Sequence, residues 1–303
     1  MNDLIPGAVA GPPDGRNFEA SWYGDYLQAH LLSDVGLKRQ KNEDSCLMCA
    51  PKNPVLIDER GLFFAVADGM GGASAGEFAS RMSLRAMHTA YYTGPRHSIP
   101  LALEESLEDA NQRVFEEAEI NPDYAGMGTT VSVVLIDGGW AYIAQVGDSR
   151  VYLLRERSGI HQITEDHSLV AEQVRMGVLS EEEAENSSFK NLITRAVGIK
   201  AEVEVDLFAV RIVPGDTILI CSDGLSNMVN DEGIATCLSD GDLKLGTRKV
   251  VDMALANGGS DNVTALTIRV IDQPPRAPLQ SGAREVNVPK GGLWGRFLSL
   301  FGF

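Results

Sequence analysis

The stretch GTTVSVVLIDGGWAYIAQVGDSRVYLLRE, residues 128–156, contains three runs rich in β-branched and aromatic residues. An Asp-Gly-Gly turn at residues 137–139 joins the first two runs, and Gly147 and Asp148 precede the third. Turns of this composition between short apolar runs favour antiparallel hairpins. The stretch therefore predicts an antiparallel meander of three strands.

Helices are predicted on both sides of this meander. Apolar residues recur with a period of about 3.6 residues from Ala75 onward, and helical signals continue near 99–120 and over 243–258. Ser74 and Glu77 can form a capping box for the first of these helices. Its start therefore lies directly after a cluster of glycines.

Two further apolar runs are short enough to be buried strands. They are DTILICSD at 216–223 and NVTALTIRV at 262–270. Helices that are segregated from antiparallel strands are typical of an α+β fold. We expect two packed sheets covered by helices.

The ends of the chain differ in composition from its middle. Residues 1–20 are rich in Pro and Gly and lack periodicity, so we expect a flexible arm. Residues 272–292 have the composition of a linker, which leaves 21–271 as the folded domain. The tail 293–303 is apolar and amphipathic, and it suits either packing against the domain or a partner, or weak contact with a membrane surface.

The net charge limits the classes of partner. The chain has 303 residues and a formal net charge of -16 at pH 7. This acidity argues against a surface for nucleic acid, which requires clustered Lys and Arg. No run approaches the ~20 apolar residues of a membrane helix, and the opening MNDLIPGAVAGPPDG lacks the pattern of a secretory signal. We therefore expect a cytoplasmic protein, with the tail as the one candidate for peripheral membrane contact.

The cysteines suggest no chemistry. Cys46 and Cys49 form a Cys-x-x-Cys pair, but Cys221 and Cys237 offer no second pair at zinc spacing. Residues three apart on a strand point to opposite faces. We expect all four cysteines to be structural.

Four aspartates share one context, because each ends or begins an apolar strand beside a small residue. They are Asp68, Asp148, Asp223 and Asp261. Any one of them alone would be a turn residue. Together at one edge they would repel one another unless a cation lay between them. Carboxylate oxygens suit magnesium or manganese rather than zinc.

The glycines after Asp68, in VADGMGGASAGE, could instead cradle a nucleotide phosphate. Neither the Lys of a P-loop nor the spacing of a dinucleotide-binding motif is present. We expect these glycines to bring backbone close to an ion, with the Gly69 carbonyl as a candidate ligand.

The stretch SDVGLKRQKNEDS, residues 33–45, adds a cation to the acidic set. Arg39 suits a bidentate grip on a phosphate, and Glu43 and Asp44 suit a metal or its water shell. Alone, this stretch would indicate an ordinary surface ion pair.

Seven motifs, taken together and in order along the chain, resemble those of the PPM-type (type 2C) metal-dependent serine/threonine protein phosphatases, especially the bacterial branch. They are SDVGLKRQKNEDS, VADGMGGASAGE, GMGTTVSVVLI, GDSRVYLL, TEDHSLV, CSDGLSN and GGSDNVT. The resemblance spans about residues 25–271. It implies a four-layer α-β-β-α sandwich in which two antiparallel sheets are flanked by helices.

The resemblance also implies roles for the site residues. Asp68 would bridge two manganese or magnesium ions, and the Gly69 carbonyl would complete the coordination of one. Asp223 and Asp261 would hold the other ion. The remaining implied roles are direct or water-mediated metal binding for Glu43 or Asp44, a third and weaker ion for Asp148, phosphate binding for Arg39 and a supporting role for Asn262.

The implied reaction is hydrolysis of phosphoserine or phosphothreonine by direct attack of a metal-bridging water or hydroxide. The enzyme would act as a monomer on phosphorylated proteins and oppose a serine/threonine kinase. Two alternatives are a catalytically silent regulatory relative and a phosphoesterase for small molecules. The first would be signalled by loss of Asp68 or Asp223, and neither is lost.

The sequence departs from the family in its histidines. Met70 and Ala73 stand where many relatives carry a His, so the general acid for the leaving group stays open. We expect a structural role for His167 and assign no catalytic His. The family places a mobile flap at 167–198, where we expect Glu181–Glu185 to be a solvated acidic segment.

Overall fold

The structure is a computed structural model that describes residues 4–71 and 75–289. The predicted tail 293–303 lies outside the described residues, as do Ala73 and the predicted helix cap Ser74.

Within the described residues, the strands form two large sheets and one short ribbon. The first sheet has seven strands, in the order β1 (Ala8–Gly11), β4 (Ser45–Cys49), β5 (Leu62–Ala67), β8 (Val131–Asp137), β9 (Trp140–Val146), β12 (Asp206–Arg211) and β15 (Arg284–Val286). The second has six, in the order β11 (Gly159–Gln162), β10 (Arg150–Arg155), β13 (Thr217–Cys221), β14 (Val263–Val270), β3 (Leu27–Asp34) and β2 (Phe18–Tyr23). The ribbon pairs β6 (Gly69–Met70) with β7 (Gly128–Thr129).

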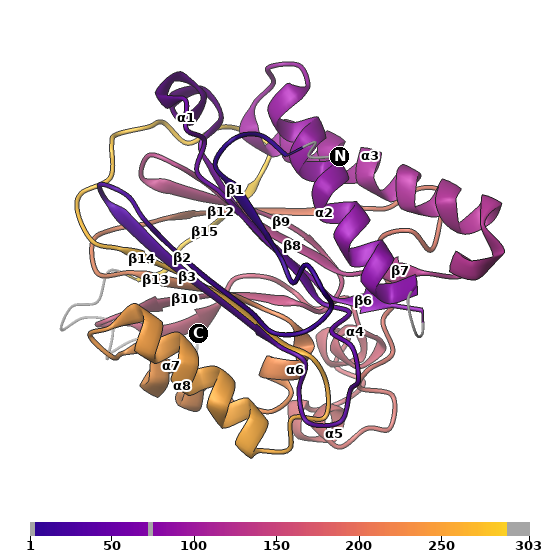
Figure 1. The fold of residues 1–303 in the computed structure, drawn as a ribbon. Helices are drawn as coiled ribbons and strands as arrows, with labels where there is room; N and C mark the ends of the chain where they lie inside the picture. Colours follow the sequence, from indigo (N-terminus) through magenta and orange to yellow (C-terminus); the bar gives the residue numbers. More distant parts are fainter. Residues whose placement is uncertain (1–3, 72–74, 290–303) are drawn as a thin grey trace.

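Within the described residues, helices cover the outer faces of both sheets or lie at the ends of the sandwich. They are α1 (Pro54–Arg60), α2 (Ala75–Thr93), α3 (Ile99–Ile120), α4 (Leu169–Arg175), α5 (Glu181–Glu185), α6 (Asp223–Ser226), α7 (Asp231–Leu238) and α8 (Leu243–Ala256), with one 3-10 turn, η1 (Pro122–Tyr124). Figure 1 shows α2 and α3 on one side of the sheets and α7 and α8 on the other. The predicted four-layer α-β-β-α sandwich is confirmed, and so are the three predicted helices, which are α2, α3 and α8.

Among residues 4–71 and 75–289, three apolar cores fill the interfaces between these layers. Met87 belongs to the core between the first sheet and its helices, Phe64 to the core between the sheets, and Val250 to the core under α8. Cys46 and Cys49, on the single strand β4, lie in different cores, as their spacing predicts. All four cysteines are buried and free, so the structural role expected for them is confirmed.

The predicted meander is only partly correct. β8 and β9 pair as a hairpin, but β10 pairs with β11 and β13 in the second sheet and not with β9. Gly147 adopts φ +106, and a Cβ there would lie 2.5 Å from the Thr130 side chain. The chain therefore turns at Gly147 from one sheet to the other. One partner of β10, β13, is distant in sequence, so local turn signals do not reveal that pairing.

The ends of the folded region also differ from the prediction. Part of the expected arm 1–20 forms β1 and β2, and part of the expected linker 272–292 forms β15, which runs parallel to β12. These strands lie at sheet edges, where Pro and Gly are tolerated and where composition is a poor guide. The division of the chain at 21 and 271 stays a prediction.

The segment before β15 crosses the first sheet and reaches α3. The Trp140 indole N–H donates to Ala277 O at 3.2 Å, and the Ile99 backbone N–H donates to Gln280 Oε1 at 2.7 Å. Among the described helices, none is long and apolar enough to cross a membrane.

Candidate metal centre

The strand register brings the predicted acidic residues to one end of both sheets. In the first sheet, Ser45 pairs with Ala67. Asp44 directly precedes Ser45 and Asp68 directly follows Ala67, so both aspartates lie at the same end of the sheet. In the second sheet, Cys221 pairs with both Arg150 and Ala265. Asp148, Asp223 and Asp261 follow or precede these paired strands by a few residues.

Asp68 is surrounded by like charges. Its side chain keeps some exposure to solvent, but the surrounding protein buries the carboxyl group and raises its pKa well above the usual range. The charges of Asp44, Asp223, Asp148 and Asp261 raise that pKa further. Because each of these carboxylates acts on Asp68, the structure brings all four predicted strand-end aspartates together, with Asp44 beside them.

Asp68 and Asp223 lie close enough for each side chain to affect the pKa of the other. Burial and the Asp261 charge raise the pKa of Asp223, whereas a side-chain hydrogen bond with Asp68 lowers it. Burial and the charges of Asp223 and Asp166 raise the pKa of Asp148 to about 8. Carboxylates in this arrangement must share a proton or a cation.

These donors fit hard divalent cations. No three His, Cys, Asp or Glu side chains of residues 4–71 and 75–289 form a preformed metal cage. Magnesium-like ions take only one or two protein carboxylates each and keep several waters, so spread oxygen donors suit them better than a closed cage does. The donor set therefore fits manganese or magnesium.

Asp44 has one engaged and one unengaged oxygen. Oδ2 accepts hydrogen bonds from Ser222 Oγ at 2.7 Å and Thr264 Oγ1 at 2.6 Å, and the side chain is 1% exposed. Oδ1 is buried and has no partner among the described residues. Burial raises the pKa of Asp44 to about 7, against the effect of these hydroxyls. An unpartnered buried carboxylate oxygen suits a metal or its water shell.

Glu43 lies beside the glycines that follow Asp68. A Cβ on Gly76 would lie 2.8 Å from the Gly69 carbonyl oxygen and 3.1 Å from Glu43 Oε2. Gly76 thus allows the start of α2 to approach both groups. Burial also raises the pKa of Glu43. The structure therefore places Glu43 and the Gly69 carbonyl in one neighbourhood.

Arg39 is bonded to this acidic set. Its Nη2 donates to Asp261 Oδ2 at 2.8 Å, and its side chain is 48% exposed. The Asn262 backbone N–H donates to the other oxygen, Oδ1, at 2.8 Å. Arg39 therefore presents a cation at the solvent side of the carboxylates.

Asn262 connects the loop of Arg39 to the second sheet. Its Oδ1 accepts from the Glu43 backbone N–H at 2.8 Å, and its Nδ2 donates to Val35 O and Lys41 O, both at 2.9 Å. Close backbone approach also matters here, because a Cβ on Gly224 would lie 1.9 Å from Asn262 O.

Several residues around the centre were missed at the level of sequence. Ser222 and Thr264 hold Asp44, and Thr130 Oγ1 accepts from the Asp68 backbone N–H at 2.9 Å. The available signal was a small hydroxyl residue within each motif, in CSDGLSN, GGSDNVT and GMGTT.

The contacts of His167 agree with the predicted structural role. Its Nδ1 accepts from the Gly147 backbone N–H at 3.0 Å, so in the neutral ring Nε2 carries the proton and faces Asp206 Oδ2 at 3.2 Å. The side chain is 3% exposed. Both ring nitrogens thus have partners other than the carboxylates of the candidate metal centre.

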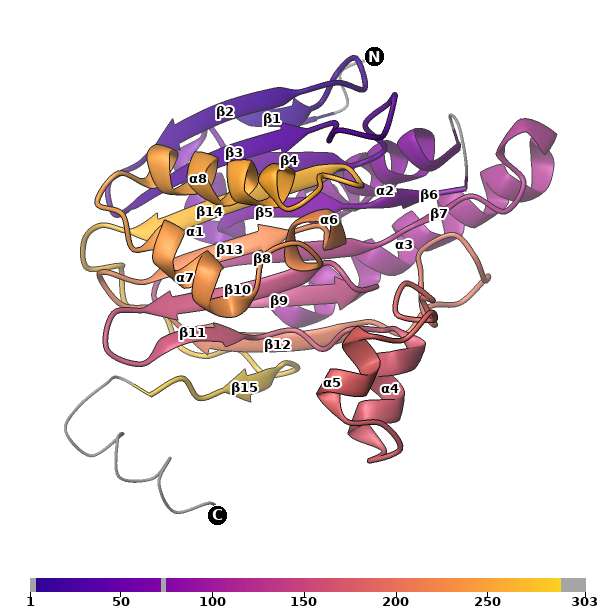
Figure 2. The same cartoon turned by 90° about the horizontal axis from the view of Figure 1, so that it is seen from below.

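Helices α4 and α5 lie at the same end of the sandwich as β6, β7 and α6 (Figure 2). Glu181, Glu182 and Glu183 are exposed, which agrees with the predicted solvated acidic segment. Met70 pairs with Gly128 in the β6–β7 ribbon.

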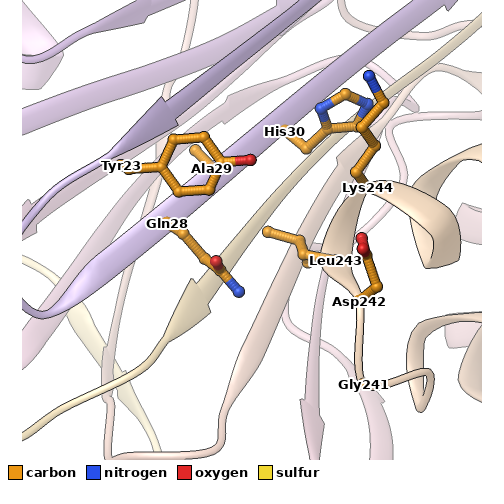
Figure 3. Close-up of a pocket in the computed structure, with 8 residues that line it drawn as sticks. All are labelled: Tyr23, Gln28, Ala29, His30, Gly241, Asp242, Leu243 and Lys244. Carbon is orange, nitrogen blue, oxygen red and sulfur yellow. The ribbon is translucent and has the colours of Figure 1, made fainter.

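A separate pocket of about 300 Å³ contains none of these residues. It lies between β2, β3 and the start of α8, where Tyr23, Gln28 and His30 face Asp242 and Lys244 (Figure 3). Gln28 pairs with Arg269, six positions before the Asp34–Val263 pair at the acidic end. The pocket is therefore distant from the candidate centre.

Comparisons with known proteins agree with one another. The family model described as Protein phosphatase 2C matches residues 38–253. The serine/threonine phosphatase stp of Listeria innocua is 37% identical over 250 residues, which cover 80% of this chain and 95% of that protein. The solved S. agalactiae serine/threonine phosphatase has a TM-score of 0.74 at 35% identity, covering 81% of this chain and 100% of that one. The PstP catalytic domain in complex with two manganese ions has a TM-score of 0.70 at 35% identity, covering 82% and 99%.

Proposed function

The chain belongs to the protein phosphatase 2C family and is a metal-dependent serine/threonine protein phosphatase, and on this premise we propose which of its residues carry the reaction. The observation that carries the proposal is the environment of Asp68, on whose buried carboxyl four other aspartates act. A centre of this kind is suited to holding divalent cations.

We propose that Asp68 bridges two ions, manganese or magnesium, and that the Gly69 carbonyl completes the coordination of one. Asp223 and Asp261 would hold the other ion. When bound, such ions supply Lewis acidity toward a phosphoryl oxygen and lower the pKa of a water nucleophile. The mutual effect of Asp68 and Asp223 on their pKa values supports this assignment, because a cation between two neighbouring carboxylates offsets their repulsion.

Three further carboxylates complete the proposed set. Asp44 would act through its unpartnered Oδ1, while Ser222 and Thr264 fix its other oxygen. Glu43 lies beside Gly69 and would bind an ion directly or through water. Asp148 would hold a third, weaker ion together with Asp223, whose charge acts on it.

Arg39 is the proposed phosphate-binding residue. Its guanidinium group is half exposed and bonded at one nitrogen to Asp261, so it can turn further N–H groups toward a phosphoryl oxygen. There it would offset negative charge that develops as the ester bond breaks.

No histidine is proposed as general acid. Met70 occupies the position where many relatives carry a His, and His167 is held by Gly147 and Asp206. The proton for the leaving alkoxide must therefore come from a source other than these two positions.

The substrates are phosphorylated proteins. A serine/threonine kinase is the enzyme class that must supply them, and we propose such a kinase as the functional opponent of this phosphatase. The monomeric state, the cytoplasmic location and the contact of the tail 293–303 with a partner or membrane surface stay predictions.

Hydrolysis of a phosphothreonine peptide with manganese tests the site assignment. We expect activity with manganese, loss of activity with excess chelator, and a loss of about 100-fold or more in Asp223→Asn. Asp252→Asn, on the exposed face of α8, is the matched control and should keep full activity. An unchanged rate in Asp223→Asn would show that the metal residues are assigned wrongly.

A further inference from the structure

Helix α3 carries a buried side-chain amide, that of Asn111, whose hydrogen-bond partners are not among the proposed site residues. Asn111 is 1% exposed on the face of α3 that packs on the first sheet. Its Oδ1 accepts from the Gly198 backbone N–H at 2.8 Å, and its Nδ2 donates to Lys200 O at 3.0 Å and Ala201 O at 3.1 Å. One side chain thus satisfies three backbone groups of a single turn, at the end of an irregular segment between α5 and β12.

The turn is fitted to α3 at a second point. Gly198 has φ +86, a conformation that favours glycine, and a Cβ there would lie 2.3 Å from Val114 Cγ1. Val114 is buried and lies one helical turn after Asn111 on the same face. The helix therefore fixes both the direction and the distance of the chain at Gly198.

A continuous set of hydrogen bonds leads from this turn to Asp68. Val197 and Thr129 exchange both backbone hydrogen bonds, at 3.0 and 2.9 Å. The carbonyl oxygen of Asp68 accepts from Thr129 Oγ1 at 2.8 Å and from the Thr130 backbone N–H at 2.9 Å. Val197, Thr129 and Thr130 are all fully buried, so little solvent competes for these bonds.

We propose that Asn111 is a positioning residue, which acts through the Val197–Thr129 pair on the backbone of Asp68. This inference rests on the proposed function, in which Asp68 bridges two ions. A carboxylate that bridges two ions must be held at a fixed place, and α3 supplies a rigid support because it is long and packed along its length. Asn111 transfers that support across the turn, where the chain has no regular structure of its own.

Manganese affinity measured by calorimetry on the full chain tests the proposal independently of catalysis. Asn111→Ala should weaken manganese binding about tenfold, as is usual when an outer support of a metal ligand is lost. Gln112→Ala is the matched control, because Gln112 lies next to Asn111 on the exposed face of α3, where its side chain donates to Glu116. The control should bind manganese as the wild type does. Equal affinity in Asn111→Ala and the wild type would overturn the proposal.

A double-mutant cycle with Thr129→Val tests the route. Thr129→Val removes the hydroxyl bond to Asp68 O and keeps the shape of the side chain. If both residues act on Asp68 through one path, the double variant should lose less affinity than the two single losses combined. Simple multiplication of the two losses would overturn the route through Thr129.

A second variant and the wild type itself complete the test. If Asn111→Ala does not fold, Asn111→Asp keeps the volume and the acceptor for Gly198, and it should still weaken manganese binding. Wild-type affinity in a folded Asn111→Asp would then overturn the proposal. If the wild type itself binds no manganese, the metal assignment fails. If the wild type binds and the Asn111 variants match it, only the positioning role fails.

Discussion

Arg39 and Asp261 stand 222 positions apart in the sequence, yet Arg39 Nη2 donates to Asp261 Oδ2 at 2.8 Å. This bond joins the proposed phosphate-binding cation to a proposed metal-binding carboxylate. The hydrogen bond to Asp261 raises the pKa of Arg39, and so do the nearby charges of Asp261, Glu43 and Asp68, whereas burial lowers it. The net effect is a raised pKa. The guanidinium group is therefore held beside the acidic centre by Asp261, one of the carboxylates proposed to bind metal.

Replacement of Arg39 should affect substrate more than metal. Arg39→Ala should lower kcat/KM for a phosphopeptide about 10- to 100-fold, because a hydrogen bond between charged groups contributes about 1.5–3 kcal/mol. Arg39→Lys should recover part of the loss, since it keeps the charge and loses the fork of donors. Steady-state kinetics with saturating manganese measures both. A larger change in manganese affinity than in kcat/KM would show that Arg39 mainly supports Asp261.

Asp68→Asn should have opposite effects on stability with and without metal. The raised pKa of Asp68 means that its ionised form is unfavourable in the metal-free fold, so a neutral amide should raise the Tm in chelator by about 2 °C or more. In manganese, the wild type should gain about 2.7 kcal/mol when the ion is at 100 times its Kd, and the variant should gain less. Thermal melts in chelator and in manganese check both signs. A lower Tm of the variant in chelator would contradict the account of repulsion.

The residues of the acidic centre were largely predictable, because the sequence itself shows aspartates beside small residues at the ends of apolar strands. Asp68, Asp223 and Asp261 each follow or precede an apolar strand, and such strand ends come together when the two sheets pack with these ends on the same side. What holds them was not predictable. Ser222 and Thr264 bond Asp44 only because β13 and β14 pair, and Asn111 reaches Gly198 only because α3 covers the first sheet. Long-range contacts of this kind leave no periodic trace in the sequence.

The same reason explains the errors in the fold. The turn at Gly147 resembles a hairpin turn locally, but β10 pairs with β11 and β13 of the second sheet. The Pro- and Gly-rich ends read as loose because composition reports local flexibility. Their pairing at the sheet edges depends on strands that lie elsewhere in the chain.

His88 should make the fold sensitive to acid. It is fully buried in the core under α2, neither ring nitrogen has a partner among the described residues, and burial lowers its pKa from 6.5 to about 4. In the unfolded chain His88 binds a proton below pH 6.5, whereas in the native state it resists protonation. Its contribution to stability is therefore present above pH 6.5 and is lost toward pH 4, up to about 3 kcal/mol.

His88→Leu should remove that part of the acid sensitivity. Urea unfolding of wild type and variant at several pH values between 7 and 4, all in excess chelator, measures the difference. The free energy of unfolding should fall less steeply with decreasing pH in the variant than in the wild type. Parallel curves over this range would rule out His88 as a source of acid sensitivity.

His167 should matter for stability and not for proton transfer. Burial raises the pKa of Asp206, but the hydrogen bonds from His167 and Arg195 outweigh burial and bring it to about 2. His167→Gln should therefore lower the free energy of unfolding by about 1–3 kcal/mol, because buried partners lose their bonds. The pH dependence of kcat should keep its shape. Loss of an alkaline limb in the variant would instead identify His167 as the missing general acid, because a general acid must be protonated to act.

The segment 272–289 should behave as part of the folded domain. It supplies β15 to the first sheet and accepts a hydrogen bond from the Trp140 indole. It also accepts from the Ile99 backbone N–H at the start of α3, and Val288 O accepts from the buried Arg155 guanidinium at 2.7 Å. Deletion of 272–303 should therefore cost about 3 kcal/mol or more of stability, since each lost hydrogen bond contributes about 1 kcal/mol. Deletion of 290–303 alone keeps all of these contacts and is the matched control. Chemical unfolding of the three chains measures the difference, and membrane fractionation of the shorter deletion tests the tail. Equal stability of all three chains would show that 272–289 is the linker that its composition predicts. A loss of stability confined to the longer deletion would place the end of the folded domain near Val288.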